Sequence, residues 1–119
     1  MKVAPETSLI RPHVVCAILR DITFTQASYD SFIELQDKPH SGLARHRTLI
    51  SMGTHDLDTI KGPITYEALP PEQIKFRPLN QEVTVDGNEL IKLYESDNKI
   101  KKYLHIIRDS PVYPVIYDS

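Results

Sequence analysis

The sequence has a single cysteine and no tryptophan, and the shortage of cysteine excludes two kinds of cross-link. Cys16 is the only cysteine among 119 residues. An intrachain disulfide and a zinc site of the CxxC type are therefore both excluded. Because the sequence neighbours of Cys16 are aliphatic, we expect a buried structural thiol rather than a reactive one.

Long apolar runs are also missing from the sequence. No stretch approaches the roughly 18 apolar residues that a membrane-spanning helix requires. Residues 1–6 lack the apolar core of a secretory signal peptide. The sequence therefore predicts a cytoplasmic protein with no membrane partner.

An excess of charge of one sign is absent too. The formal net charge is −2, so the chain as a whole is not a general polyanion binder, and any nucleic-acid contact needs a local basic patch. The hydrophobic share of 40% and the charged share of 25% are ordinary for a globular protein, and the length predicts one domain. Nine prolines and four glycines indicate short elements with stiff connections.

The start of the chain divides into two stretches. Residues 1–12 are polar and contain two prolines, so we expect an N-terminal leader there, followed by one domain over residues 13–119. Residues 13–19 form a continuous apolar run of strand length. Such a run predicts a strand that is buried on both faces of a sheet.

A helix is predicted next. Apolar side chains recur at helical spacing over residues 29–35. Thr25 or Ser28 can cap its N-terminus. We expect Pro39 to end it, because proline lacks the amide donor and disfavours helical geometry in the preceding residue.

The remaining predicted elements are short. They are a turn or short helix at 41–47, strands at 48–53, 64–68 and 111–117, turns at 55–58 and 70–74, a capped helix from residue 86, and an ambiguous stretch at 100–107. The prolines near 111–117 favour an edge position for that strand. This mixture predicts an α+β fold, with short mixed or antiparallel strands packed with two moderate helices.

A carboxamide, a carboxylate and a guanidinium flank the end of the first predicted helix. Gln36 and Asp37 lie in its last turn, and Arg47 follows Gln36 by eleven residues. The basic or potentially basic side chains nearby are Lys38, His40, Arg45 and His46. Such a run is usually a solvated face, but beside a cleft it could hold the phosphates of a nucleic-acid end.

Two other clusters of polar residues could be functional sites, but each also has a simpler structural interpretation. His55, Asp56 and Asp58 resemble metal ligands, but three such residues this close in sequence rarely surround one ion, so we expect them to cap a turn. A second basic cluster is either solvated surface or an RNA contact, and it consists of Lys99, Lys101, Lys102 and His105. The sequence contains no P-loop, GxGxxG, GxSxG or HExxH motif.

Several longer motifs occur in a fixed order along the chain. They are FIELQDK (32–38), GTHDLDT (53–59), GPITY (62–66), IKFRPLN (74–80), YLHII (103–107) and YPVIYDS (113–119). In order and spacing this set resembles the B3/B4 region of the β subunit of archaeal and eukaryotic phenylalanyl-tRNA synthetase, a class II aminoacyl-tRNA synthetase. In that family the region edits mischarged tRNA.

The resemblance implies an activity and residue roles. Residues 13–119 would be part of a domain that hydrolyses mischarged Tyr-tRNA(Phe). Gln36 would orient water or substrate, Asp37 would assist, and Arg47, with Arg45, would hold the 3′ end of the tRNA, the three catalytic groups meeting at one hollow. Val112 would line the substrate pocket. Asp37 stands where the family carries glutamate.

The resemblance also implies partners. The parent enzyme uses ATP and Mg²⁺, whereas no cofactor or metal is expected in this segment. The 3′ end of tRNA(Phe) and the synthetase α subunit are the implied partners. Because the family region continues past YPVIYDS, we expect a fragment whose last strand can self-associate. The alternative is a non-catalytic RNA-binding or subunit-assembly module, with a metal-dependent hydrolase as a more distant one.

Overall fold

The computed structural model describes all 119 residues, and the chain forms two compact units. The first, here called the sheet unit, comprises Met1–Cys16 and Lys61–Ser119. The second, here called the helix unit, comprises Ala17–Ile60. No helix is long and apolar enough to cross a membrane.

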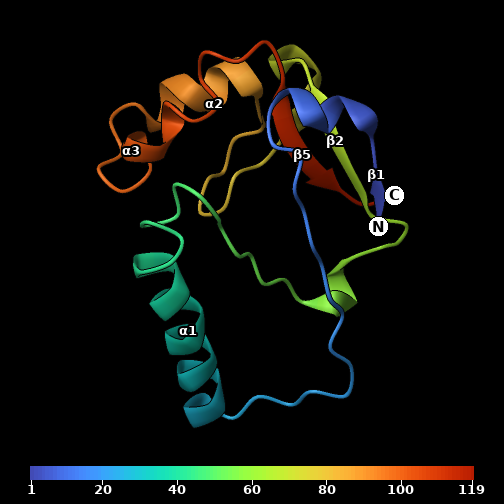
Figure 1. The fold of residues 1–119 in the computed structure, drawn as a ribbon, viewed down its shortest axis with the longest axis vertical. Helices are drawn as coiled ribbons and strands as arrows, with labels where there is room; N and C mark the ends of the chain where they lie inside the picture. The colour runs from blue at the N-terminus through green and yellow to red at the C-terminus, as the bar shows by residue number, and fades with distance from the viewer. The chain divides into compact units, whose positions relative to one another are not determined.

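A three-stranded sheet organises the sheet unit. Its strands are β1 (Lys2–Val3), β2 (Thr65–Leu69) and β5 (Tyr113–Tyr117), in the order β1-β2-β5. β1 is parallel to β2 and β5 is antiparallel to it, so β2 lies in the middle (Figure 1). The prediction of an edge strand at 111–117 is confirmed, and Pro114, which cannot donate a ladder hydrogen bond, lies on this edge.

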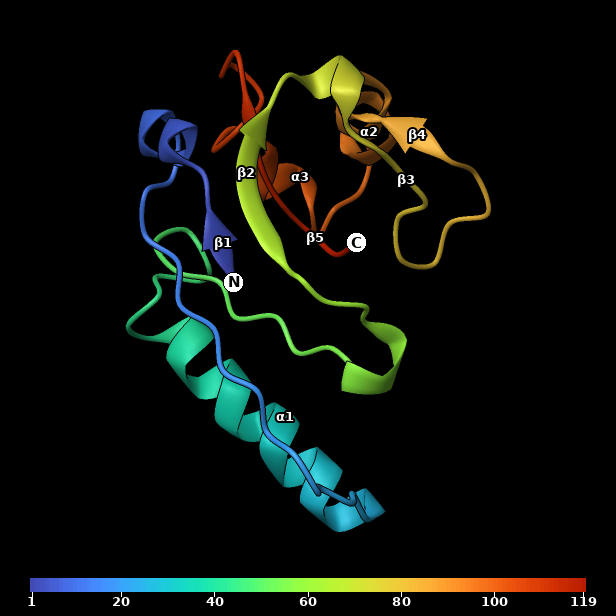
Figure 2. The same cartoon turned by 90° about the vertical axis from the view of Figure 1, so that its right-hand side faces the viewer.

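The other elements of the sheet unit are short. They are the 3-10 helices η1 (Pro5–Leu9) and η3 (Pro71–Gln73), the hairpin strands β3 (Lys75–Phe76) and β4 (Val85–Asp86), and the helices α2 (Gly87–Tyr94) and α3 (Lys101–Leu104). Figure 2 shows the β3–β4 hairpin beside α2. The α+β class is confirmed, and the ambiguous stretch 100–107 contains a helical turn, α3.

Local chemistry explains where α2 begins. The Asp86 side chain accepts hydrogen bonds from the backbone N–H groups of Asn88 and Glu89, and the Glu89 carboxylate accepts one from the N–H of Asp86. This reciprocal arrangement is the predicted capping box. Ile91 is the buried apolar side chain of α2, at 7% exposed, and Leu90, Leu93 and Tyr94 are half-buried.

The core of the sheet unit lies where these elements meet. Ile74, Ile91, Leu104 and Tyr113 form the buried cluster. Each comes from a different part of the unit, so the cluster joins η3, α2, α3 and β5. Burying one aliphatic side chain of this size contributes about 1.5–3 kcal/mol to folding.

Residues 1–12, expected to form a leader, instead belong to the sheet unit. β1 pairs with β2, and η1 follows with Thr7 buried. The Tyr66 hydroxyl donates a hydrogen bond to the Arg11 carbonyl oxygen at 2.6 Å. This segment therefore occupies the side of β2 opposite β5.

The predicted buried strand at residues 13–19 was wrong. The stretch has no regular secondary structure, Val15 is 96% exposed, and Cys16, expected to be buried, is exposed too. A strand buried on both faces needs hydrogen-bonded neighbours. Here β1 and β5 already occupy both edges of β2.

The long helix α1 (Gln26–Ser41) dominates the helix unit. Thr25 caps it as predicted, since the Thr25 hydroxyl accepts a hydrogen bond from the Ser28 N–H and the Ser28 hydroxyl accepts one from the Thr25 N–H. The prediction that Pro39 ends the helix was wrong, because α1 continues to Ser41. Proline so near the C-terminus costs little more than its own missing donor, and the Pro39 carbonyl accepts from Ala44 N–H.

The chain after α1 forms turns rather than a strand. The predicted strand at 48–53 is absent, whereas the turn predicted at 41–47 is present. Three backbone donors of the expected strand bond locally: Thr48 N–H to Arg45 O, Leu49 N–H to Ala44 O, and Met52 N–H to the His40 ring. Where a turn was expected at 55–58 the chain forms the 3-10 helix η2 (Leu57–Thr59), which Asp56 caps.

Candidate functional site at the end of helix α1

Gln36 and Asp37 lie near the C-terminal end of α1, as the sequence predicted. Gln36 is half-buried and Asp37 is exposed. Adjacent helical residues differ in direction by about 100°. The carboxamide and the carboxylate therefore meet different neighbours.

Arg47 reaches the helix end through an unusual backbone turn. Arg45, His46 and Arg47 have φ values of 46°, 54° and 69°, all in the left-handed region. This conformation costs a non-glycine residue roughly 1–2 kcal/mol. Hydrogen bonds hold the turn, from Arg47 N–H to His40 O at 3.3 Å and from the Thr48 hydroxyl to Arg45 O at 2.7 Å. Strain of this kind concentrates at functional sites.

The turn brings Arg47 to Asp37. Arg47 Nη2 lies 3.6 Å from Asp37 Oδ1, with the two side chains 46% and 61% exposed. A solvated, single-contact pair of this kind contributes about 0–1 kcal/mol to stability. The pair therefore orients the guanidinium without occupying all of its donors.

Gln36 meets a different partner. The Thr54 hydroxyl donates a hydrogen bond to Gln36 Oε1 at 2.7 Å. Thr54 belongs to the GTHDLDT stretch, so the contact joins two of the sequence motifs. The bond uses the carbonyl oxygen of the carboxamide and leaves its two N–H donors available to other partners.

His40 differs from its prediction. Its place in the basic run predicts a solvated side chain, but it is only 3% exposed. Its Nε2 accepts a hydrogen bond from Met52 N–H at 2.8 Å, and its Nδ1 lies 3.8 Å from Asp37 Oδ1. Its helical spacing from Asp37 was the available signal, because residues three apart lie on one helix face.

Arg45 and Val112 are the remaining predicted site residues. Arg45 is exposed on the left-handed turn, two residues before Arg47 in sequence. Val112 is half-buried directly before β5 and belongs to the sheet unit, whereas the Gln36–Asp37–Arg47 group belongs to the helix unit.

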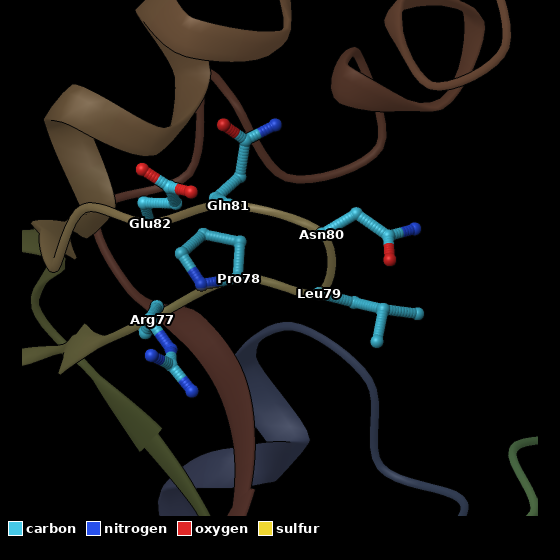
Figure 3. A pocket seen from close by; sticks show the side chains of 6 residues that line it. All are labelled: Arg77, Pro78, Leu79, Asn80, Gln81 and Glu82. Atoms are coloured by element: carbon cyan, nitrogen blue, oxygen red, sulfur yellow. The ribbon is translucent and has the colours of Figure 1, made fainter.

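A hollow in the sheet unit contains none of the predicted catalytic residues. Its volume is about 480 Å³, and it is lined by six consecutive residues of the β3–β4 loop, Arg77 to Glu82. Figure 3 shows Leu79 and Asn80 pointing away from the loop rather than toward a shared centre. None of the predicted site residues lines it.

The acidic turn of the GTHDLDT stretch has a structural role. Asp56 Oδ1 accepts a hydrogen bond from Asp58 N–H at 3.0 Å and caps η2, as predicted. The structure contains no group of three or more histidine, cysteine, aspartate or glutamate side chains placed to hold a metal ion.

Comparison with known proteins gives a consistent family. No protein-family model matches the chain. The sequence is 60% identical over 119 residues to the cytoplasmic phenylalanine–tRNA ligase beta subunit of Arabidopsis thaliana and 59% identical over 119 residues to the beta subunit of Drosophila melanogaster. It is 54% identical over 117 residues, 98% of the chain, to the Homo sapiens beta subunit. The chain spans 20% of the length of each of these relatives.

A solved structure agrees with the sequence comparison. The fold matches the crystal structure of an N-terminal fragment of the phenylalanyl-tRNA synthetase beta subunit from Pyrococcus horikoshii, with a TM-score of 0.88 and 32% sequence identity. The match covers 99% of this chain and 33% of that chain. Over its whole length this chain is thus homologous to the phenylalanine–tRNA ligase beta subunit, and it corresponds to about a fifth of such a subunit.

Proposed function

We propose that this segment is part of an editing domain that hydrolyses the ester of mischarged Tyr-tRNA(Phe). The observation that carries the proposal is the contact of Arg47 with Asp37 at the end of α1, one residue after Gln36, where a left-handed turn returns the arginine to the helix. The homology with phenylalanine–tRNA ligase beta subunits supports it. In this assignment residues 13–119 are a part of the B3/B4 region.

Such an enzyme has a reason to edit. Tyrosine differs from phenylalanine by one hydroxyl group, and an apolar synthetic pocket rejects such an addition weakly. A second site that hydrogen-bonds the hydroxyl prefers tyrosine, because phenylalanine would leave the polar groups of the site unpaired. We place Val112 on the wall of that second pocket.

The side chains at the end of α1 suit ester hydrolysis. The Gln36 amide N–H donors can hold the attacking water or the ester carbonyl, whose oxygen gains negative charge in the transition state. Arg47 and Arg45 can bind the phosphates at the 3′ end of the tRNA. Asp37 then assists by orienting Arg47, 3.6 Å away, rather than by contacting the ester.

The intact protein supplies the rest of the reaction. We propose that it pairs with an α subunit, uses ATP and Mg²⁺ to attach phenylalanine to tRNA(Phe), and works in the cytoplasm, as the name of the Arabidopsis relative states for that protein. The editing step itself needs only water as a co-reactant, since ester hydrolysis splits Tyr-tRNA into tyrosine and tRNA.

The test is deacylation by the full-length subunit assembled with its α subunit. We expect Arg47→Ala to slow hydrolysis of Tyr-tRNA(Phe) roughly 10- to 100-fold, the equivalent of about 1.5–3 kcal/mol for a charge-assisted hydrogen bond. Synthesis of Phe-tRNA(Phe) should remain unchanged. Arg20→Ala, which removes an exposed arginine that precedes α1 in the helix unit, is the matched control.

The other outcomes are equally informative. Tyr-tRNA that binds the wild-type complex without being hydrolysed would overturn the proposal and support the RNA-binding alternative. That alternative is favoured by the exposed lysines around α3, Lys99, Lys101 and Lys102. Deacylation that disappears with a chelator would indicate a metal-dependent hydrolase instead.

A further inference from the structure

A buried histidine lies between the two halves of the candidate site. His40 is 3% exposed, and its ring contacts Asp37 on one side and the backbone of Met52 on the other. The functional roles assigned above use neither ring nitrogen. A buried polar side chain with two such neighbours calls for a specific explanation.

The hydrogen bond to Met52 determines the tautomer of His40. Because Met52 N–H donates to Nε2, that nitrogen must present a lone pair, and the proton of the neutral ring then resides on Nδ1. Nδ1 has no hydrogen-bond partner in the protein, but it lies 3.8 Å from Asp37 Oδ1. The Nδ1 proton is therefore attracted by the same carboxylate oxygen that faces Arg47.

Each ring nitrogen leads to one of the groups that would act on the substrate. Through Nδ1 and Asp37, His40 reaches Arg47. Through Nε2 and Met52, it anchors the segment that carries Thr54, which donates its hydroxyl hydrogen bond to Gln36. The imidazole thus couples the helix end to the loop that follows.

We propose that His40 is a positioning residue of the editing site, which holds Asp37 through Nδ1 and the Met52–Thr54 segment through Nε2. The proposal rests on the editing function proposed above. The two ring nitrogens then support different steps. The Nδ1 side supports binding of the tRNA end through Arg47, and the Nε2 side supports the hydrolytic step through Gln36. Small displacements of positioned groups cost as much as about 100-fold in rate.

Two substitutions separate the two sides in the full-length complex. His40→Gln keeps an acceptor near the place of Nε2 and loses the donor toward Asp37. We expect it to raise KM for Tyr-tRNA(Phe) about 10-fold with kcat nearly unchanged. His40→Asn keeps a donor near the place of Nδ1 and loses the acceptor, and we expect it to lower kcat about 10-fold with KM nearly unchanged.

Asp37 offers a variant that leaves the buried position intact. Asp37→Ala should reproduce the KM increase of His40→Gln, and the double variant should show no further increase, because both changes interrupt one chain of contacts. Additive effects would show that His40 and Asp37 act independently. This comparison holds even if the His40→Asn variant folds poorly.

Hydrogen exchange tests the positioning role of His40 separately from the editing activity. The Met52 amide of the full-length complex should be protected in wild type and in His40→Gln, and should exchange faster in His40→Asn. If the wild-type complex does not hydrolyse Tyr-tRNA, the editing proposal fails. If it does, and the Gln and Asn variants show the same kinetics as each other, the positioning role of His40 is overturned.

Discussion

Tyr66 shows how one side chain links the first residues of the chain to the central strand. It is 5% exposed near the start of β2, and its hydroxyl donates to the Arg11 carbonyl at 2.6 Å. Burial raises the pKa of the Tyr66 hydroxyl above its usual value of 10.0, and the nearby positive charge of Arg11 opposes part of that shift. The neutral phenol is therefore the form that the folded protein favours.

The consequence is a loss of stability at alkaline pH. A group whose pKa is raised on folding contributes stability that is complete below its unfolded pKa and is lost as the pH rises through the folded value. The relevant window for Tyr66 therefore begins near pH 10.0. Burial also raises the pKa of Tyr113, and a hydrogen bond to Glu67 raises that of Tyr117, so the same trend extends to β5.

Tyr66→Phe tests this behaviour. Near neutral pH we expect the free energy of unfolding to fall by about 1–3 kcal/mol, because the Arg11 carbonyl loses its donor. Above about pH 10 the difference between wild type and variant should narrow, because only wild type loses the Tyr66 contribution. Urea unfolding followed by tyrosine circular dichroism measures both. A difference that widens with pH would contradict the assignment, and Tyr29→Phe on exposed α1 is the control near neutrality.

At the scale of elements, Gly87 determines how closely α2 approaches η3. A Cβ at this position would lie 2.7 Å from the Pro71 carbonyl oxygen and 2.8 Å from Pro71 Cα. Both are backbone atoms that cannot move aside as a flexible side chain would. The first residue of α2 therefore has to be glycine for a tertiary reason, independent of the capping box that begins the helix.

Gly87→Ala should destabilise the sheet unit. Overpacking against backbone costs about 1–3 kcal/mol, more than the gain in helix propensity of about 1 kcal/mol. Asn88→Ala, at the next and exposed position of α2, is the matched control and should be neutral or slightly stabilising. Thermal unfolding of the two variants measures the difference, and equal melting temperatures would refute the close contact.

At the scale of the whole molecule, the two units differ in what holds them together. The sheet unit has a buried apolar cluster, whereas the only buried residues of the helix unit are His40 and Ala44. Much of the apolar surface of the helix unit is exposed, including Leu35 at 65% and Leu43 at 85%. Regions with few buried apolar contacts open at lower free energy than a packed core.

Hydrogen exchange should reveal this difference. We expect the slowest amides in β2 and β5, intermediate protection in α1, and nearly unprotected exchange over residues 13–24 outside the helix, where the backbone N–H groups make no ladder or helical bonds. Mass spectrometry of proteolytic peptides gives the required resolution. Protection of α1 equal to that of β2 would show that the two units unfold together.

Much of the local structure could be predicted because it depends on neighbours in the sequence. The Thr25 cap, the Asp86–Glu89 box and the Asp56 turn each need only side chains within a few residues. The placement of Gln36 and Asp37 near a helix end followed in the same way. The prediction for Pro39 was wrong because proline in the last turn of α1 removes only its own amide donor, and Gly42 N–H still bonds to Lys38 O.

The sequence by itself determined the family, the α+β class and the caps, because these depend on residue types at short and regular spacing. Only the tertiary structure decided that β1 rather than residues 13–19 pairs with β2, that Gly87 must lack a side chain, and that His40 is buried beside Asp37 and Met52. Those features arise from contacts between segments far apart in the chain or from a turn with three left-handed residues. Neither hydrophobic periodicity nor local propensity carries information about such contacts.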